Sequence, residues 1–501
     1  MSDDERPPFV TTEDWAATPP AVQQAFLSLV DMVHTLSAEV TRLRAQITDL
    51  QARLNQTSQN SSKPPSSDPP SAPPRPPKHP RGRPRGGQPG HPGHERPLAP
   101  DEQVDTIIPL YPTQCSWCRA IFPDTLPDVA PVVHTQVWDL PTRLIHVTDY
   151  QQHTVACPCC DTIQQAAAPT GLPPGVFGPG VTARTAMLRR YRLSAREVVD
   201  FWQSVVGMPI SLGSVVRLCH RMSAALEPLD TAIRTCVQHA PTVHVDETRW
   251  REANQSAWLW TAVTPQATSF RIDRSRSRAV FARVLPNADQ QIITSDRYGV
   301  YHHLDNHRRQ LCWAHLMRDL RACLERTPAA QQWAQAILTQ VQVAFAYWHW
   351  YQVELIDRMQ LQVLLAPIRA TIVDDIRFGM VDDAQTNTLR ADLLRHWDAL
   401  WTFSRVDGVE PTNTSAERAI RPAVMWRKIC FGTQSADGSR FVERLLSVVA
   451  TCRQLGRSVS LCDPHQCTPR ILEQAGFPRS FCHPLNGYPY LTNAQQRGIV
   501  I

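Results

Sequence analysis

The 501-residue chain contains very little lysine, which occurs only at Lys63, Lys78 and Lys428. Arginine therefore supplies 48 of the 51 basic residues. A GC-rich genome explains such a bias, because arginine codons are rich in G and C. The rigid guanidinium fork also suits contacts with phosphate and guanine. Composition alone does not separate these two explanations.

Long apolar runs and an export signal are also missing. No stretch of about 18 or more apolar residues occurs, so we expect no membrane span. Residues 1–5 are acidic where a signal peptide would be basic and then apolar, which predicts a cytoplasmic protein. The 14 cysteines are too sparse for a dense disulfide pattern and instead favour a reducing compartment with some metal-bound thiolates.

The residues that are present indicate several folded domains. The length suggests about three domains of roughly 150 residues. The apolar content of 42%, with 14 Trp and 14 Phe, excludes a wholly disordered chain. We expect a multidomain α/β protein.

Residues 20–55 carry apolar side chains at alternating spacings of three and four, a heptad pattern held for about four repeats. A single helix with such a stripe must bury it, so we expect a coiled coil that joins copies of the chain. The alternative is a helix packed on its own domain. The stripe consists of Phe26, Leu29, Val33, Leu36, Val40, Leu43, Ile47, Leu50 and Leu54.

Residues 56–100 are rich in proline and arginine, which predicts an extended, disordered linker. Within this linker, Arg81, Arg83 and Arg85 form an Arg-Gly-Arg-Pro-Arg sequence. Such a sequence is narrow enough to enter an A·T-rich minor groove, where the negative potential attracts arginine. A basic linker without DNA contacts is the alternative.

Two cysteine pairs with C-x2-C spacing lie in residues 101–170, and each pair could place both sulfurs on one ion. Together they predict a four-thiolate zinc site in a zinc-ribbon-like domain, with residues 132–140 between them as strands. Cys159 is an additional thiol, and His153 is an alternative ligand. The predicted ligands are Cys115, Cys118, Cys157 and Cys160.

Residues 175–238 have a helical pattern with features of a helix-turn-helix. Ser194 and Glu197 form a capping-box sequence, and the helix that they begin should end at Gly207. A second short helix follows, with Arg217 and Arg221 facing outward as candidate DNA contacts. An ordinary helical hairpin fits the same pattern.

Residues 239–325 change to a strand pattern in the order strand, strand, strand, helix, strand. The first run ends at Asp246 and the fourth at Asp296, which is the arrangement of a ribonuclease H-like fold. If these strands are neighbours, the two carboxylates meet at one edge and repel unless a cation lies between them. Mg²⁺, or Mn²⁺ in its place, suits such oxygen ligands.

Glu417, in residues 409–458, is the best candidate for a third carboxylate. Arg421, Val424 and Lys428 follow it at helical spacing, so one helix face would offer a ligand and then cations for DNA phosphates. Pro422 should interrupt or kink this helix. A solvated surface group is the alternative for any one of these acids.

Several segments in a fixed order resemble transposases of the insertion sequence 66 family, whose catalytic domain is of the DDE type. They comprise the heptad helix, residues 61–68, the paired C-x2-C motifs, and residues 245–248, 295–298, 312–319 and 415–422 followed by Arg427 and Lys428.

This resemblance implies that Asp246, Asp296 and Glu417 bind Mg²⁺, and that residues 326–408 form a helical insertion in the ribonuclease H-like core. His315 and Arg318 lie in a motif that the family shares near its active site, where phosphate contact, support of Asp296 or a structural role are all open. Thr414 departs from the family's usual asparagine, and the role of residues 459–501 stays open.

The expected function is a DNA transposase that binds the terminal inverted repeats of an insertion sequence, cuts the DNA and transfers the strand. DNA ends, target DNA, a second copy of the chain and accessory proteins encoded by the element are the expected partners, in the cytoplasm at the nucleoid. A nuclease of the same fold without strand transfer, or a non-catalytic DNA-binding regulator from a decayed element, are the alternatives.

Overall fold

The computed structural model describes residues 11–54, 98–122, 131–132, 134–138, 140–141, 144–156, 158–160, 162–169, 172 and 175–457. The predicted linker lies almost entirely outside these residues, and Arg81, Arg83 and Arg85 lie outside them with it. Cys157 and the whole of the predicted C-terminal tail also lie outside the described residues. The chain divides into two compact units, one of residues 74–168 and 201–209, and one of the remaining residues. Each unit is considered by itself.

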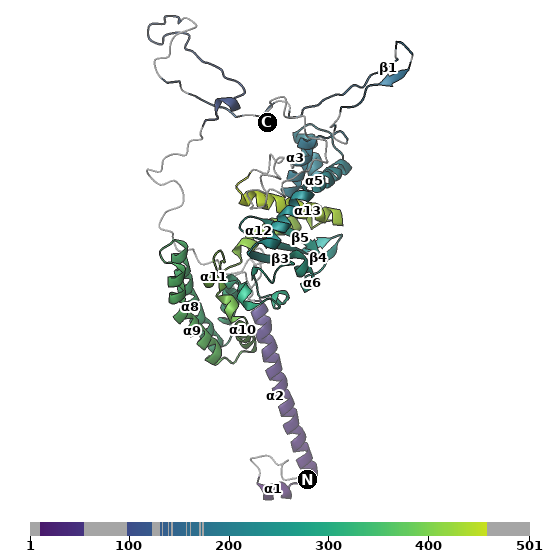
Figure 1. The fold of residues 1–501 in the computed structure, drawn as a ribbon. Coiled ribbons are helices and arrows are strands. Elements are labelled where there is room, and N and C mark those ends of the chain that lie inside the picture. The colour runs from purple at the N-terminus through teal and green to yellow at the C-terminus, as the bar shows by residue number, and fades with distance from the viewer. Residues whose placement is uncertain are drawn as a thin grey trace. The chain divides into compact units, whose positions relative to one another are not determined.

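The predicted heptad segment is one continuous helix, α2 (Pro20–Leu54), and a short helix α1 (Thr12–Ala17) precedes it (Figure 1). Trp15 of α1 packs against Phe26 of α2 with ring centroids 6.0 Å apart. The apolar stripe from Leu29 to Leu54 is exposed on the single chain. Burial of this stripe on a second helix stays a prediction.

Cys115 and Cys118 lie in one tight turn, and Cys159 and Cys160 lie in another. Residues 114 and 121 form an antiparallel bridge around Cys115 and Cys118. Strands β1 (Thr154–Ala156) and β2 (Ile163–Gln165) pair in an antiparallel hairpin around residues 157–160. The expected strands within residues 132–140 are absent from the described part of that segment. There the Gln136 side chain instead bonds to the backbone N–H and carbonyl of Ala99, at 2.7 and 3.1 Å.

The helical segment differs from the expected pair of short helices. Helix α3 (Pro179–Arg190) is followed by α4 (Ala195–Asp200), which begins with the predicted capping box between Ser194 and Glu197. A π-helical turn η4 (Phe201–Val205) then leads to Gly207, whose φ of +74° is the left-handed conformation expected there. The next helix, α5 (Leu212–His239), has 28 residues and is therefore not the short helix that was expected.

A five-stranded mixed sheet with the order β5-β4-β3-β6-β7 forms the centre of the larger unit (Figure 1). Its strands are β3 (Thr242–Glu252), β4 (Gln255–Val263), β5 (Thr268–Asp273), β6 (Ile292–Ser295) and β7 (Arg309–Leu311). Strands β3, β4 and β5 pair antiparallel, whereas β6 and β7 pair parallel to β3 and to β6. Helix α6 (Arg278–Val284) connects β5 to β6 as expected, and β7 had no counterpart in the prediction.

Helices cover both faces and one edge of this sheet. Helix α12 (Thr414–Cys430) contacts β3 and β4, and it continues through Pro422, contrary to the expected interruption. Helix α13 (Ala436–Gln454) runs along the edge strand β5, where Ser447 and Thr451 accept hydrogen bonds from the N–H groups of Phe270 and Thr268. These side chains satisfy edge groups that would otherwise be left unpaired.

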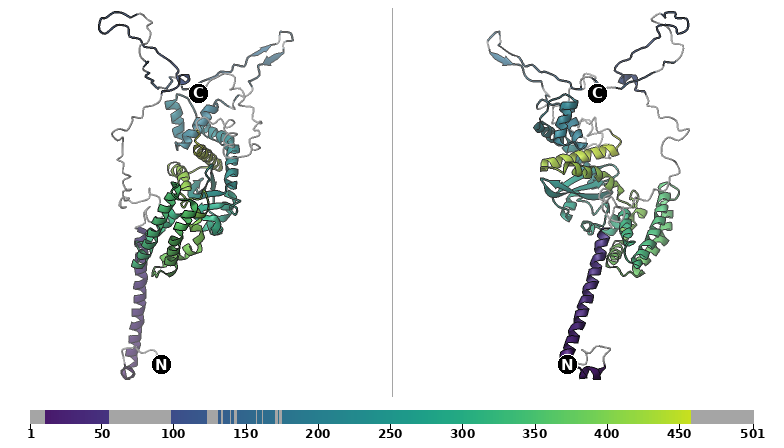
Figure 2. Two further views of the ribbon diagram at one scale, coloured as in Figure 1. Left: turned by 60° about the vertical axis from the view of Figure 1, so that its left-hand side comes forward. Right: turned by 180° about the vertical axis from the view of Figure 1, so that it is seen from behind.

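The chain between β7 and α12 is helical, and these helices lie together beside the sheet (Figure 2). Helix α7 (Trp313–Cys323) leads into α8 (Pro328–Gln352), α9 (Arg358–Phe378), α10 (Ala384–Arg395), η7 (Trp397–Leu400) and α11 (Thr402–Arg405). Their buried side chains form a second hydrophobic core with Trp313, Trp333, Trp348 and Trp401. No helix of the described segments is both long and apolar enough to cross a membrane.

Candidate active site

The register of β3 and β6 brings two of the predicted acids to corresponding positions. The parallel pairing ends at His244 opposite Thr294. Asp246, within β3, and Asp296, directly after β6, each lie two residues further along the chain, so the same register puts them at corresponding positions where the two strands separate. Strand β3 does not end at Asp246, as the sequence had suggested, because its pairing with β4 continues to Glu252.

A buried asparagine, Asn413, positions the third acid. Its side-chain amide donates to the carbonyl oxygen of Val245 at 2.7 Å, and its backbone N–H donates to Cys312 Sγ at 3.1 Å. Its own carbonyl accepts the backbone N–H of Glu417 at 3.1 Å in the first turn of α12. Asn413 therefore fixes the start of the Glu417 helix against the strand that carries Asp246.

Two residues of α7 lie next to the Glu417 carboxylate. Arg318 Nη2 is 3.4 Å and His315 Nδ1 is 3.5 Å from Glu417 Oε1. Burial chiefly, and then the charge of Arg318, lowers the pKa of His315, so its imidazole is neutral at neutral pH. The sequence resemblance implied that His315 and Arg318 lie near the active site, and both residues lie next to the third acid.

The carboxylates influence one another strongly. Burial, followed by the negative charges of Glu247, Asp296 and Glu417, raises the pKa of Asp246 well above its usual range. Tyr298 donates its backbone N–H to Asp296 Oδ1 at 2.9 Å. A bound divalent cation would compensate this concentration of negative charge, and carboxylates are the ligands that a hard cation such as Mg²⁺ prefers. Among the described residues, the group around Glu417 whose ligand atoms lie within 4.8 Å of one another is Cys312, His315 and Glu417, not the three acids.

Glu247 is a fourth acid that the sequence analysis did not single out. Its neighbour Asp246 points to the α12 side of β3, and Glu247 points to the opposite face, because side chains alternate along a strand. There Arg276 Nε donates to Glu247 Oε1 at 2.6 Å, and the Tyr301 hydroxyl donates to its other oxygen. Glu247 is thus already paired with a guanidinium and a hydroxyl on the face of β3 opposite Asp246.

The buried Arg309 on β7 supports the loop that begins at Asp296. Its guanidinium donates to the carbonyl of Asp296 at 2.8 Å and to Ser295 Oγ at 3.3 Å. Burial lowers its pKa to about 10, against the opposing effect of Asp296. Arg309 thus holds the backbone at the second acid, and no sequence motif had indicated it.

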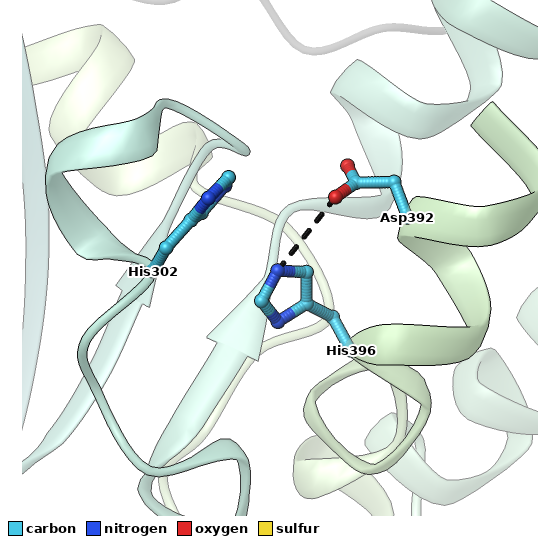
Figure 3. A group of neighbouring side chains, drawn as sticks. All are labelled: His302, Asp392 and His396. Atoms are coloured by element: carbon cyan, nitrogen blue, oxygen red, sulfur yellow. Dashed lines mark ion pairs between the residues drawn. The ribbon is translucent and has the colours of Figure 1, made fainter. Parts of the chain in front are cut away.

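A second group of metal-type ligands joins α10 to the loop after β6 (Figure 3). His302, Asp392 and His396 each place one ligand atom within 4.8 Å of the others. His396 Nε2 lies 3.7 Å from Asp392 Oδ1, whose other oxygen accepts from Arg297 at 2.6 Å. Because Arg297 already neutralises this carboxylate, the cluster carries less uncompensated charge than the three acids above.

The predicted DNA-contacting residues of the larger unit differ in exposure. Arg217, Arg421 and Lys428 are exposed. Arg427 is tied to β3 through bonds to the carbonyl of Arg249, at 2.6 Å, and to Thr248. The prediction that Arg221 faces outward is wrong, because its side chain is half-buried and donates a hydrogen bond to the carbonyl oxygen of Phe177 at 3.0 Å.

The first cysteine turn has the local geometry of a metal-binding knuckle. Hydrogen bonds from the backbone N–H groups of Cys118 and Trp117 lower the pKa of the Cys115 thiol. Such bonds stabilise a thiolate, the form that binds zinc. Cys118 and Cys160 are exposed in their turns, and the fourth predicted ligand, Cys157, lies outside the described residues.

Comparison with known proteins places this site within a described family. The profile of the "Transposase IS66 family" matches residues 174–440, more than half of the chain. Residues 17–97 match a "Family of unknown function (DUF6444)". The chain is also 28% identical over 170 residues to "Uncharacterized protein y4jO" of Sinorhizobium fredii. The aligned segment covers 33% of this chain and 49% of that protein. The chain thus spans about half the length of this relative.

Proposed function

The chain belongs to the IS66 family of transposases, and from that premise we propose that it is a metal-dependent DNA transposase of the DDE type. It binds the terminal inverted repeats of an insertion sequence, cuts the DNA and joins the freed strand to a target. The observation that supports this proposal is the register of β3 and β6, which puts Asp246 and Asp296 at corresponding positions, together with the electrostatic influence of Asp296 and Glu417 on Asp246.

The strand order and directions support a ribonuclease H-like core interrupted by a helical insertion before Glu417. In this core Asp246, Asp296 and Glu417 would hold Mg²⁺, or Mn²⁺ in its place. The bound ions would stabilise charge on the attacking and leaving oxygens of a phosphodiester. His315 and Arg318 keep Glu417 directed toward the other two acids, and Asn413 keeps its helix in register.

The remaining parts of the chain would bring DNA to this site. Exposed Arg421 and Lys428 lie on the same face of α12 as Glu417 and would contact phosphates. The cysteine turns would form a zinc ribbon that, with the α3–α5 segment, recognises the element ends. Dimerisation through α2 would let one assembly hold both ends. We place this activity in the cytoplasm at the nucleoid, with accessory proteins of the element as further partners.

The substitution Asp246→Asn tests the proposal, because it removes one ligand charge with little change in shape. DNA carrying the element ends should remain bound, while Mg²⁺-dependent cleavage should be lost. Asp289→Asn, in the loop before β6, is the matched control and should cleave normally. Cleavage by Asp246→Asn at the unmodified rate would refute the assignment of this acid.

Strand transfer needs a separate assay, because a nuclease would use the same carboxylates. Pre-cut element ends with a free 3′-hydroxyl should be joined to a target plasmid by the full chain. Cleavage of intact ends without any joining of pre-cut ends would favour a nuclease. Specific binding without either reaction would favour a regulator derived from a decayed element.

A further inference from the structure

A cavity of about 500 Å³ lies beside the candidate active site, where β3 and β5 begin and β4 ends. Helices α12 and α13 and the last residue of α3 form its walls. This volume is within the range of sites that hold small ligands. None of the three predicted acids lines it. The charged or ionisable residues of its lining are Arg190, Arg418, Arg453, Glu410 and His244.

The three arginines of this cavity have no carboxylate partner among the described residues. Arg190 is half-buried, and its Nε is buried without a hydrogen-bond partner. Burial and then the positive charge of Arg453 lower the pKa of Arg190, and the Arg190 guanidinium lies over the Tyr191 ring, 5.5 Å from the ring centroid. Glu410 is the one acid in the lining, against three arginines. An anion would relieve this repulsion and take up the free donors.

The histidine in the lining does not add to the positive charge. Burial lowers the pKa of His244, although Glu410 opposes this effect. Its Nδ1 lies 3.3 Å from the side-chain oxygen of Asn413. His244 is therefore a neutral hydrogen-bonding group at neutral pH, on the same face of β3 as Asp246 and about 7 Å before it along the strand.

The rest of the cavity surface is largely apolar. Its apolar part includes Val263, Pro265, Phe270, Leu446, Val449 and Ala450, and the polar side chains of Thr242, Thr264, Thr268, Ser415 and Gln454 also line the cavity. A free inorganic ion would leave this surface facing water. A ligand that joins an anionic group to a flat apolar group would satisfy both the arginines and this surface, and a nucleotide has this combination.

We propose that this cavity binds one unpaired nucleotide of a DNA strand, with its phosphate at Arg190 and Arg453 and its base against the apolar wall. The choice of DNA over a free nucleotide rests on the proposed function. The cavity would hold a nucleotide near the strand segment that carries Asp246, so that an adjacent phosphodiester is kept at the acids.

Binding to the full chain tests this inference with three probes: deoxyadenosine monophosphate, inorganic phosphate and a short single-stranded oligonucleotide. The monophosphate should bind, and the oligonucleotide should compete with it for the cavity. Inorganic phosphate should bind about tenfold more weakly than the monophosphate, or weaker still, because it lacks a base. The substitutions Arg190→Gln and Arg453→Gln should each weaken monophosphate binding by about tenfold or more. Arg377→Gln, at an exposed site on α9, is the matched control.

Several results would overturn the inference. Unchanged monophosphate affinity in both arginine variants would exclude the cavity, and phosphate binding as tight as that of the monophosphate would exclude a base site. A lack of competition by the oligonucleotide would assign the cavity to free nucleotides instead. The variant Arg453→Lys distinguishes loss of the positive charge from disruption of the fold. It keeps the charge and should recover part of the monophosphate affinity that Arg453→Gln loses.

The test of the cavity and the test of the proposed function can fail independently of each other. Asp246→Asn should bind the monophosphate like the unmodified chain. If Asp246→Asn still cleaves DNA, the catalytic assignment fails while the cavity result stands. If the arginine variants bind normally while Asp246→Asn is inactive, only the cavity assignment fails.

Discussion

The side-chain amide of Asn413 donates a hydrogen bond of 2.7 Å to the carbonyl oxygen of Val245, the residue directly before Asp246. Strand β6 stops pairing with β3 at His244, so the next part of this strand edge is open. Asn413 occupies this opening and also begins the helix that carries Glu417. One buried side chain thus connects two acids that are 171 residues apart in the chain.

Replacement of Asn413 by leucine should separate these two acids. It removes the bonds to Val245 and His244 and leaves a buried carbonyl unpaired, which typically costs about 1–3 kcal/mol. We expect a lower free energy of unfolding in urea and a fall in DNA cleavage larger than the fall in DNA binding. Asn387→Leu, at an exposed site on α10, is the control. Equal cleavage by both variants would show that Asn413 does not position Glu417.

Helix α13, whose side chains bond to the edge strand β5, should contribute strongly to the free energy of unfolding. Residues 443, 447 and 451 of α13 repeat about every 6 Å, close to the roughly 6.6 Å between alternate N–H groups of a strand. Ser447→Ala should lower the free energy of unfolding by about 1–3 kcal/mol, because it leaves the Phe270 N–H unpaired. Ser256→Ala, at an exposed site on β4, serves as the comparison, and an equal midpoint of denaturation for both variants would contradict this role.

The group around His396 should make the protein less stable in acid. Burial, followed by the charge of Arg309, lowers the pKa of His396 to about 4, against about 6.5 in an unfolded chain. Between these values the unfolded state binds more protons, so the free energy of unfolding should fall as the pH decreases from about 6.5 to about 4. Thermal unfolding across this range should depend less on pH in His396→Gln, whereas His307→Gln should follow the unmodified chain.

The cysteine turns should hold one zinc ion. Cys118→Ser should reduce the zinc content of the purified full chain by one ion per chain, because it removes one of four thiolates. Cys236→Ser, in helix α5, is the matched control and should leave the zinc content unchanged. Equal zinc in the two variants, measured by mass spectrometry of the metal, would exclude the predicted site.

The exposed stripe of α2 should determine the oligomeric state. Leu36→Asp together with Leu43→Asp places charge in the predicted seam, which should dissociate the assembly into monomers in light scattering. The control is Gln46→Asp, an exposed position outside the stripe. An unchanged mass for the seam variant would assign the contact between copies to another surface.

The sequence predicted elements best where a local pattern determines them. The α2 heptads, the Ser194 capping box, the β4 and β5 strands and α6 are set by side chains within a few residues of each other, so they could be read directly. The continuous α12 was predicted less well, because packing on β3 and β4 outweighs the hydrogen bond that Pro422 removes. Strand β7 is three residues long and has too little pattern to be recognised.

For the candidate site, the sequence by itself determined which acids are present and that Asp296 follows a strand, because residue type and alternation are local properties. Only the tertiary structure decided that Glu417 approaches them, that Asn413 and Arg309 hold their backbones, and that Arg221 turns inward. These contacts join residues far apart in the chain. They exist only once the sheet has paired and α12 has packed against it, since no local pattern specifies a partner at such a separation.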